Sequence, residues 1–285
     1  MTPFPTTTVT LAGCQLAPTL GDIAGNAEMV ADAVGRAVAL GAAVVVLPEL
    51  VSSGYVFHDT AEALTVAERP DGATVTQWCR LAAEHRIVLV GGFCERGGDT
   101  DPDGTVFNSA AMVDSTGLRA VYRKVHLWDR ERLIFTAGSG RPPVVPTAVG
   151  VISTMICYDL EFPEWVRLPA LGGAQLLAAP VNWPDYPRPD DERPGEVVRV
   201  QADAGVNRMA VLACDRTGVE RGVDWIGGTV IADVNGWAAA GGWANPQETI
   251  VVAEVDLELA RDKIVGGLSN IHADRRPKLY GPVLD

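Results

Sequence analysis

The sequence predicts an α/β fold: a four-layer α-β-β-α sandwich with internal pseudo-two-fold symmetry. Short apolar runs, typical of strands buried on both faces, alternate with segments of helical periodicity. The two halves repeat one pattern, since residues 108–117 align with residues 227–236 and place Asp114 over Asp233. Each half alone would leave one sheet face bare, so the two sheets are expected to pack against each other.

In the N-terminal half, three strands are expected to alternate with two helices, and two hairpin strands follow. The first helix begins after Asp22, carries Val30 and Val34 at helical spacing and ends at Gly41. Thr74 is expected to cap the second helix. The expected strands are residues 9–16, 43–47, 87–93, 106–113 and 118–122.

In the C-terminal half, a buried strand at residues 151–156 leads to Cys157, and a helix then begins at Pro163, whose ring presets a helical φ. A second helix is expected over residues 195–206, after a loop rich in Pro and Asp at 182–193. The other expected strands are residues 174–180, 209–214, 227–232 and 249–255.

Length and composition indicate one globular domain, residues 1–285, in which residues 270–285 form a C-terminal tail with little core-forming character. A net charge of −13 argues against nucleic-acid binding, which needs clustered Lys and Arg. The longest apolar run, residues 42–47, is far shorter than the roughly 20 residues of a membrane span, and the N-terminus lacks signal-peptide character. Neither nucleic-acid nor membrane partners are therefore expected.

The five cysteines form an odd set without a C-x-x-C pair. They predict no disulfide framework and no zinc ribbon, and they favour a reducing cytoplasm. Residues 99–104 match the opening of a calcium loop, but Ala110 stands where the bidentate glutamate is needed. The four histidines show no metal-ligand spacing, so no metal and no cofactor are expected.

Three side chains stand at strand ends, where α/β sheets place reactive groups. Glu49 follows an apolar strand and a proline, Lys124 follows a hairpin strand, and Cys157 ends a buried strand. Taken one at a time, Glu49 could be a solvated carboxylate, Lys124 a turn lysine and Cys157 a small buried thiol. Together they supply a nucleophile, a base for its proton and a cation for an oxyanion, which the backbone N–H of Tyr158 would assist.

Segments 46–49, 122–127 and 156–164 read Val-Leu-Pro-Glu, Tyr-Arg-Lys-Val-His-Leu and Ile-Cys-Tyr-Asp-Leu-Glu-Phe-Pro-Glu. In order and spacing they resemble the three signature segments of the nitrilase superfamily of carbon–nitrogen hydrolases, in its amidase-like branch. The resemblance runs from Cys14 to Val255. It implies an αββα sandwich that pairs into an eight-layer homodimer or a higher homo-oligomer.

The resemblance also implies a Glu–Lys–Cys triad, with Glu49 as general base, Lys124 as oxyanion stabiliser and Cys157 as the nucleophile that forms a thioester. A second family glutamate corresponds to Glu131, for which the alternatives are a surface charge or the neighbouring Asp129. The implied reaction converts a small non-peptide amide to a carboxylic acid and ammonia.

Relatives that act on N-carbamoyl-D-amino acids bind a carboxylate through arginines after the nucleophile, whereas Leu160 and Glu161 stand here. An anionic substrate is therefore disfavoured, and Glu161 either attracts an amine-bearing substrate or is a helix-start charge. Cys-Tyr-Asp in place of the Cys-Trp-Glu of family nitrilases favours amides over nitriles. The candidate pocket residues are Tyr55, Trp128, Tyr158, Glu161, Asn182 and Trp183.

Several alternatives remain. An N-carbamoyl-amine amidohydrolase, a nitrilase or an acyltransferase would use the same thioester chemistry. A Cys–His hydrolase would use His58 or His126 as its base. A non-catalytic thiol sensor or scaffold would need only a reactive Cys157, although no resolving cysteine lies near it in the sequence.

Overall fold

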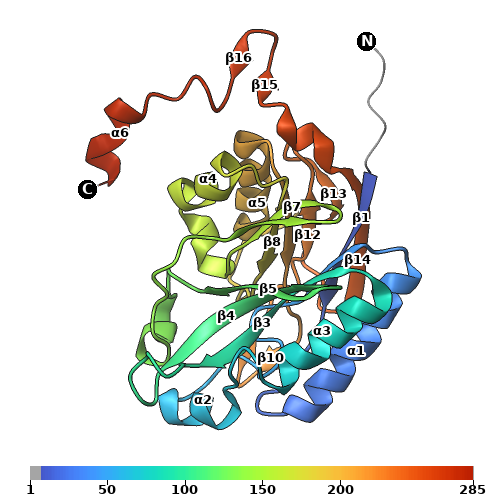
Figure 1. The fold of residues 1–285 in the computed structure, drawn as a ribbon, viewed down its shortest axis with the longest axis vertical. Helices are drawn as coiled ribbons and strands as arrows, with labels where there is room; N and C mark the ends of the chain where they lie inside the picture. Colours follow the sequence, from blue (N-terminus) through green and yellow to red (C-terminus); the bar gives the residue numbers. More distant parts are fainter. Residues whose placement is uncertain (1–7, 285) are drawn as a thin grey trace.

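Two six-stranded sheets pack face to face, with helices on both outer sides (Figure 1). The computed structural model describes residues 8–284, so nearly all of the N-terminal stretch considered for a signal peptide lies outside it. The predicted α-β-β-α sandwich is confirmed. Across residues 8–284, no helix combines the length and apolar character needed to span a membrane.

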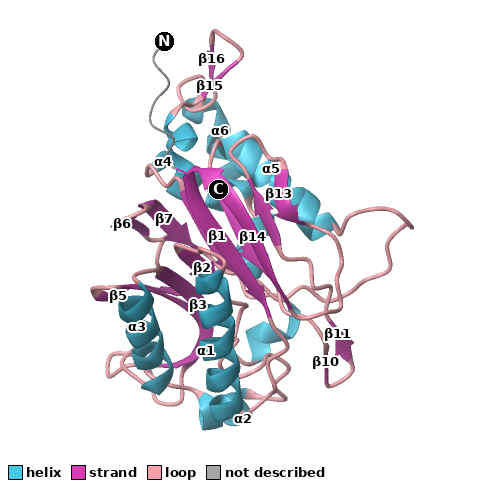
Figure 2. Cartoon of the chain, turned by 90° about the vertical axis from the view of Figure 1, so that its right-hand side faces the viewer, coloured by secondary structure: helices cyan, strands magenta, loops and turns pink. Residues whose placement is uncertain are grey.

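The first sheet combines the N-terminal half with a strand from near the other end of the chain. Its order is β14-β1-β2-β3-β4-β5, in which β1, β2 and β3 run parallel. β14 pairs antiparallel with β1 along its whole length (Figure 2). The strands are β1 (Thr8–Gln15), β2 (Val44–Val46), β3 (Val88–Arg96), β4 (Val106–Asp114), β5 (Gly117–Arg123) and β14 (Thr249–Asp256).

The second sheet repeats this arrangement. Its order is β13-β12-β9-β8-β7-β6, with β7, β8 and β9 parallel and the other strands antiparallel to their neighbours. The strands are β6 (Val144–Thr147), β7 (Gly150–Thr154), β8 (Leu176–Pro180), β9 (Ala210–Cys214), β12 (Val230–Ala232) and β13 (Ala238–Gly241).

Matching turns carry the internal symmetry to the level of single residues. Asp114 and Asp233 each accept a hydrogen bond at 2.8 Å from the backbone N–H two positions later. Gly117 and Gly236 close these turns with φ of +110° and +86°, values in the region that favours glycine. The aligned Asp and Gly positions of the two halves therefore build the same turn.

Three layers of apolar packing hold the sandwich together. One layer lies between the first sheet and its helices and contains Val34 and Trp78. Another lies between the two sheets and contains Leu11 and Ile152. The third lies between the second sheet and its helices and contains Val200. The covering helices are α1 (Ile23–Ala39) and α3 (Ala73–His85) on one side, and α4 (Pro163–Leu171) and α5 (Gly195–Asn207) on the other.

Smaller helices and strands lie outside the two large sheets and their covering helices. The last segment, with β15, β16 and α6, extends away from the layers (Figure 1). These elements are α2 (Thr60–Val66), α6 (Pro277–Leu284), the 3₁₀ helices η1 (Asp129–Leu133), η2 (Cys157–Glu161) and η3 (Leu257–Arg261), and the short strands β10 (Val219–Glu220), β11 (Val223–Asp224), β15 (Ile264–Val265) and β16 (Ser269–Asn270).

Two local expectations were wrong. Thr74 lies inside α3, whose N-cap is Gly72, and the Glu68 carboxylate accepts the Thr74 backbone N–H at 3.0 Å. The cap function therefore comes from a side chain outside the helix.

The strand expected to reach Cys157 ends at Thr154. The chain turns there because the Asp159 carboxylate accepts the Ile156 backbone N–H at 3.1 Å and holds the start of η2. The edge strands β6 and β13 and the helix α2 were not expected, since short elements at the margin of a fold carry little periodic signal.

Candidate active site

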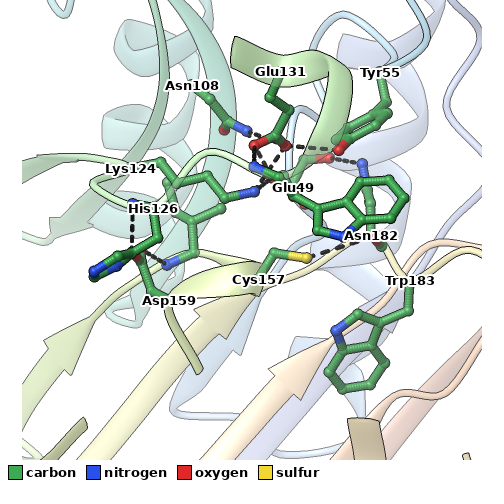
Figure 3. A network of polar contacts seen from close by, with 12 residues as sticks. Glu49, Tyr55, Asn108, Lys124, His126, Glu131, Cys157, Asp159, Asn182 and Trp183 are labelled. Carbon is green, nitrogen blue, oxygen red and sulfur yellow. Dashed lines mark hydrogen bonds and ion pairs between the residues drawn. The ribbon is translucent and has the colours of Figure 1, made fainter. Parts of the chain in front are cut away.

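The three predicted residues reach the site from the ends of different strands. Glu49 follows β2, Lys124 follows β5 directly, and Cys157 opens η2 after β7. Their side chains lie close to one another (Figure 3). Glu49 and Lys124 are fully buried and Cys157 is 8% exposed, so the polar cluster is largely closed off from bulk water.

Lys124 lies between two carboxylates. Its Nζ donates to Glu49 Oε1 at 2.7 Å and to Glu131 Oε1 at 2.8 Å. Glu131 belongs to η1, and its second oxygen accepts the Trp128 backbone N–H at 2.8 Å. The neighbouring Asp129 is exposed, so Glu131 is the carboxylate that joins this cluster.

Two further donors complete the cluster. Asn108 Nδ2 donates to Glu49 Oε1 at 2.6 Å and lies 3.3 Å from Glu131 Oε1. The Tyr55 hydroxyl donates to Glu131 Oε1 at 2.7 Å. Sequence analysis missed Asn108, a polar residue inside the buried strand β4, and treated Tyr55 only as a pocket wall.

Cys157 sits on a strained turn beside this cluster. Its φ is +47°, a left-handed conformation that costs a non-glycine residue about 1–3 kcal/mol and clusters at functional sites. Its thiol donates to the Asn182 carbonyl oxygen at 3.5 Å, while Asn182 Nδ2 donates to the Glu49 carbonyl oxygen at 2.9 Å. Asn182 therefore ties the cysteine turn to the segment that carries Glu49.

Burial and charge decide where the protons reside. Burial raises the pKa of Glu49 to about 7; Lys124 opposes the rise and Glu131 adds to it. Burial alone would lower the pKa of Lys124, but the charges of Glu131 and Glu49 outweigh it and keep that pKa above its usual value. Burial, and then the charge of Glu49, raises the pKa of the Cys157 thiol well above its usual value. Burial and the charge of Glu49 therefore both favour the neutral thiol over the thiolate.

Cys157 opens onto a small cavity of about 50 Å³. Five of the predicted pocket residues line it together with the cysteine: Trp128, Tyr158, Glu161, Asn182 and Trp183. Glu196, Pro184 and Tyr186 complete the wall. Tyr55 instead lines a neighbouring cavity of about 380 Å³, which it shares with Glu131.

The two histidines of the Cys–His alternative have other surroundings. His126 Nδ1 lies 2.7 Å from Asp159 Oδ1 (Figure 3). The His126 ring stacks on Phe162 with the centroids 3.9 Å apart. His58 is exposed. Cys157, by contrast, lies beside Glu49 and Lys124 (Figure 3), and the charges of both residues act on the pKa of its thiol.

Asp159 joins the two segments that carry Lys124 and Cys157. Its carboxylate accepts the Tyr122 hydroxyl at 2.8 Å and the backbone N–H groups of His126 and Ile156, each at 3.1 Å. Among the described residues 8–284, no group of three or more His, Cys, Asp or Glu side chains is placed to hold a metal ion.

Comparisons with known proteins agree with this architecture. The carbon–nitrogen hydrolase family model matches residues 10–264. A nitrilase of Pyrococcus abyssi is 35% identical over 84% of this chain and 87% of its own. An N-carbamoylputrescine amidase of Solanum tuberosum is 30% identical over 97% of this chain and 95% of its own.

The fold has the same relatives. The structure of an amidase of the nitrilase superfamily from Nesterenkonia AN1, a mutant form, superimposes with a TM-score of 0.81 at 24% identity, over 99% of this chain and all of that one. The chain is thus a hydrolase of carbon–nitrogen bonds other than peptide bonds, and it belongs to the carbon–nitrogen hydrolase family of the nitrilase superfamily.

Proposed function

We propose that the protein hydrolyses a small non-peptide amide to a carboxylic acid and ammonia through a thioester on Cys157. The observation that carries the proposal is the buried ammonium of Lys124, held between Glu49 and Glu131 beside the thiol. A thiol, a base and a fixed cation are the groups that acyl transfer to sulfur requires.

In the first step, the Cys157 sulfur attacks the amide carbonyl carbon while Glu49 takes the thiol proton. The transfer leaves the net charge of the buried site unchanged, because a neutral thiol becomes a thiolate as a carboxylate becomes neutral. A Glu49 pKa of about 7 suits this exchange, since a general base works best near the ambient pH.

The carbonyl oxygen becomes an oxyanion in the tetrahedral adduct. We assign its stabilisation to the Lys124 ammonium and the Tyr158 backbone N–H, and such a donor contributes about 10²–10³ in rate. Glu131 would hold the ammonium in position. Collapse of the adduct breaks the C–N bond, and Glu49 returns its proton to the departing ammonia.

A water molecule then cleaves the thioester. Glu49, again ionised, takes a proton from the water as its oxygen attacks the acyl carbon, and the proton passes to the leaving Cys157 sulfur. The carboxylic acid departs and the thiol is restored. The names of the relatives support both amide and nitrile chemistry, since one is a nitrilase and another an N-carbamoylputrescine amidase.

Ammonia release from aliphatic amides, carbamoyl amines and nitriles tests the proposal. We expect amides to be hydrolysed, with turnover lowered at least about 10³-fold in Cys157→Ala. Intact-mass spectrometry during turnover should detect the acyl group on the wild-type protein alone. Undiminished turnover in Cys157→Ala would disprove the thioester route. Absence of any turnover by the wild-type protein would favour the thiol sensor.

We also propose that two copies pair. Val198 and Val206 on α5 and Leu279 on α6 are exposed apolar side chains, which a partner surface would cover. Light scattering after size exclusion should give twice the mass of one chain, and a monomer at micromolar concentration would contradict the pairing.

A further inference from the structure

The cavity at Cys157 combines aromatic walls with two acidic side chains. Trp128, Tyr158 and Trp183 supply ring surfaces, and Glu161 and Glu196 are the charged residues of the lining. Carboxylates beside aromatic rings form the kind of environment that recognises an ammonium group. Glu196 was not singled out from the sequence; its position becomes apparent only when α5 packs beside η2.

One cation partly balances the two carboxylates. Arg199 Nη2 lies 2.6 Å from Glu161 Oε1 and 3.2 Å from Glu196 Oε1. A single guanidinium against two carboxylates leaves one negative charge at this end of the cavity. Glu196 stands in the first turn of α5.

A separate feature of the cavity also points to an N–H donor in the ligand. Asn182, 1% exposed, lines the same cavity, and its Oδ1 has no hydrogen-bond partner among the described residues. Its Nδ2 is already committed to the Glu49 carbonyl, so the oxygen is the atom left to accept. A buried acceptor without a partner costs about 1–3 kcal/mol, which a bound N–H group would offset.

The spacing suits a short chain. Cys157 and Glu161 stand at opposite ends of η2, and both line the cavity. An amide whose ammonium lies a few methylene groups from its carbonyl would span from the sulfur to the carboxylates.

We propose that Glu161 and Glu196 form an ammonium-binding subsite, so that the substrates are short amides carrying a primary ammonium group. The proposal rests on the proposed amidase function and specifies its substrate class. Amides with a carboxylate at the same position would meet like charge and be rejected.

The test compares three amides of similar size: 4-aminobutanamide, pentanamide and succinamate. We expect kcat/KM for ammonia release to favour the cationic amide over pentanamide at least about tenfold, and succinamate to be the poorest. Glu161→Gln and Glu196→Gln should each lower the cationic-to-neutral ratio about tenfold, and Arg199→Gln should raise it. Glu164→Gln, an exposed carboxylate in the first turn of α4, is the matched control and should leave the ratio unchanged.

Equal kcat/KM for the cationic and neutral amides would overturn the subsite while leaving the amidase intact. If no amide is turned over, the proposed function fails, and the subsite is then decided by protection of Cys157 from iodoacetamide. Propylammonium should slow the alkylation more than 1-propanol does, and Glu161→Gln should abolish the difference. Equal protection by the two compounds would overturn the subsite on its own.

Discussion

Replacing Glu49 by Gln should stabilise the protein at pH 8 while removing its activity. Burial raises the pKa of Glu49 from 4.5 to about 7, so the ionised carboxylate is less favourable in the folded than in the unfolded chain. At 1.36 kcal/mol for each tenfold change in proton affinity, this difference in pKa corresponds to about 3 kcal/mol. Glutamine resembles the protonated carboxyl, and Lys124 keeps Glu131 as its partner.

The sign of the effect depends on pH. The folded state binds this proton more tightly, so the stability it contributes is complete below pH 4.5 and is lost as pH rises towards 7. The free energy of unfolding of Glu49→Gln should therefore exceed that of the wild type by up to about 3 kcal/mol at pH 8, and by only about 1 kcal/mol at pH 5.

Urea denaturation at both pH values, at one protein concentration, measures this difference. Cys157→Ala is the control, since it removes the nucleophile without removing a charge, and its stability difference should be the same at pH 5 and pH 8. The reasoning is refuted if Glu49→Gln is less stable than the wild type at pH 8, or if its advantage does not shrink on acidification.

Three further predictions concern the cluster and the segments that carry it. The kcat/KM for ammonia release should fall below about pH 7 as Glu49 becomes protonated, and a flat profile from pH 5.5 to 8 would exclude it as the base. Lys124→Met should lower the free energy of unfolding by about 3–5 kcal/mol in urea denaturation, because two buried carboxylates lose their cation. Adding Glu49→Gln to this variant should recover part of that loss. A Lys124→Met protein as stable as the wild type would contradict the ion-pair geometry. Asp159→Ala should lower the free energy of unfolding by about 2–5 kcal/mol in the same measurement, since several buried donors lose their acceptor. An unchanged urea midpoint would show that Asp159 does not hold the two segments together.

Much of the fold was predictable because its signals are local. Apolar runs such as residues 43–47 and helical spacing such as that of Val30 and Val34 lie within one window of sequence. The edge strand β6 escaped prediction, as it is short and contains Pro146. The N-terminus of α3 was misplaced since its acceptor, Glu68, lies outside the helix.

The same distinction applies to the candidate site. The sequence singled out Glu49, Lys124 and Cys157 by their position at strand ends, but it left Glu131 and Asp129 as alternatives. The 3₁₀ turn of η1 decides between them, because it brings Glu131 onto Lys124 and leaves Asp129 exposed.

By itself, the sequence determined the layers of the sandwich and the kinds of reactive group at its strand ends, since periodicity and motifs are properties of adjacent residues. Only the tertiary structure decided that Asn108 and Asn182 connect these groups and that Glu196 lines the same cavity as the cysteine. Such contacts join residues far apart in the chain, and they arise only when the two sheets and their helices pack together. The proton of Glu49 is likewise governed by burial, a property that no stretch of sequence possesses alone.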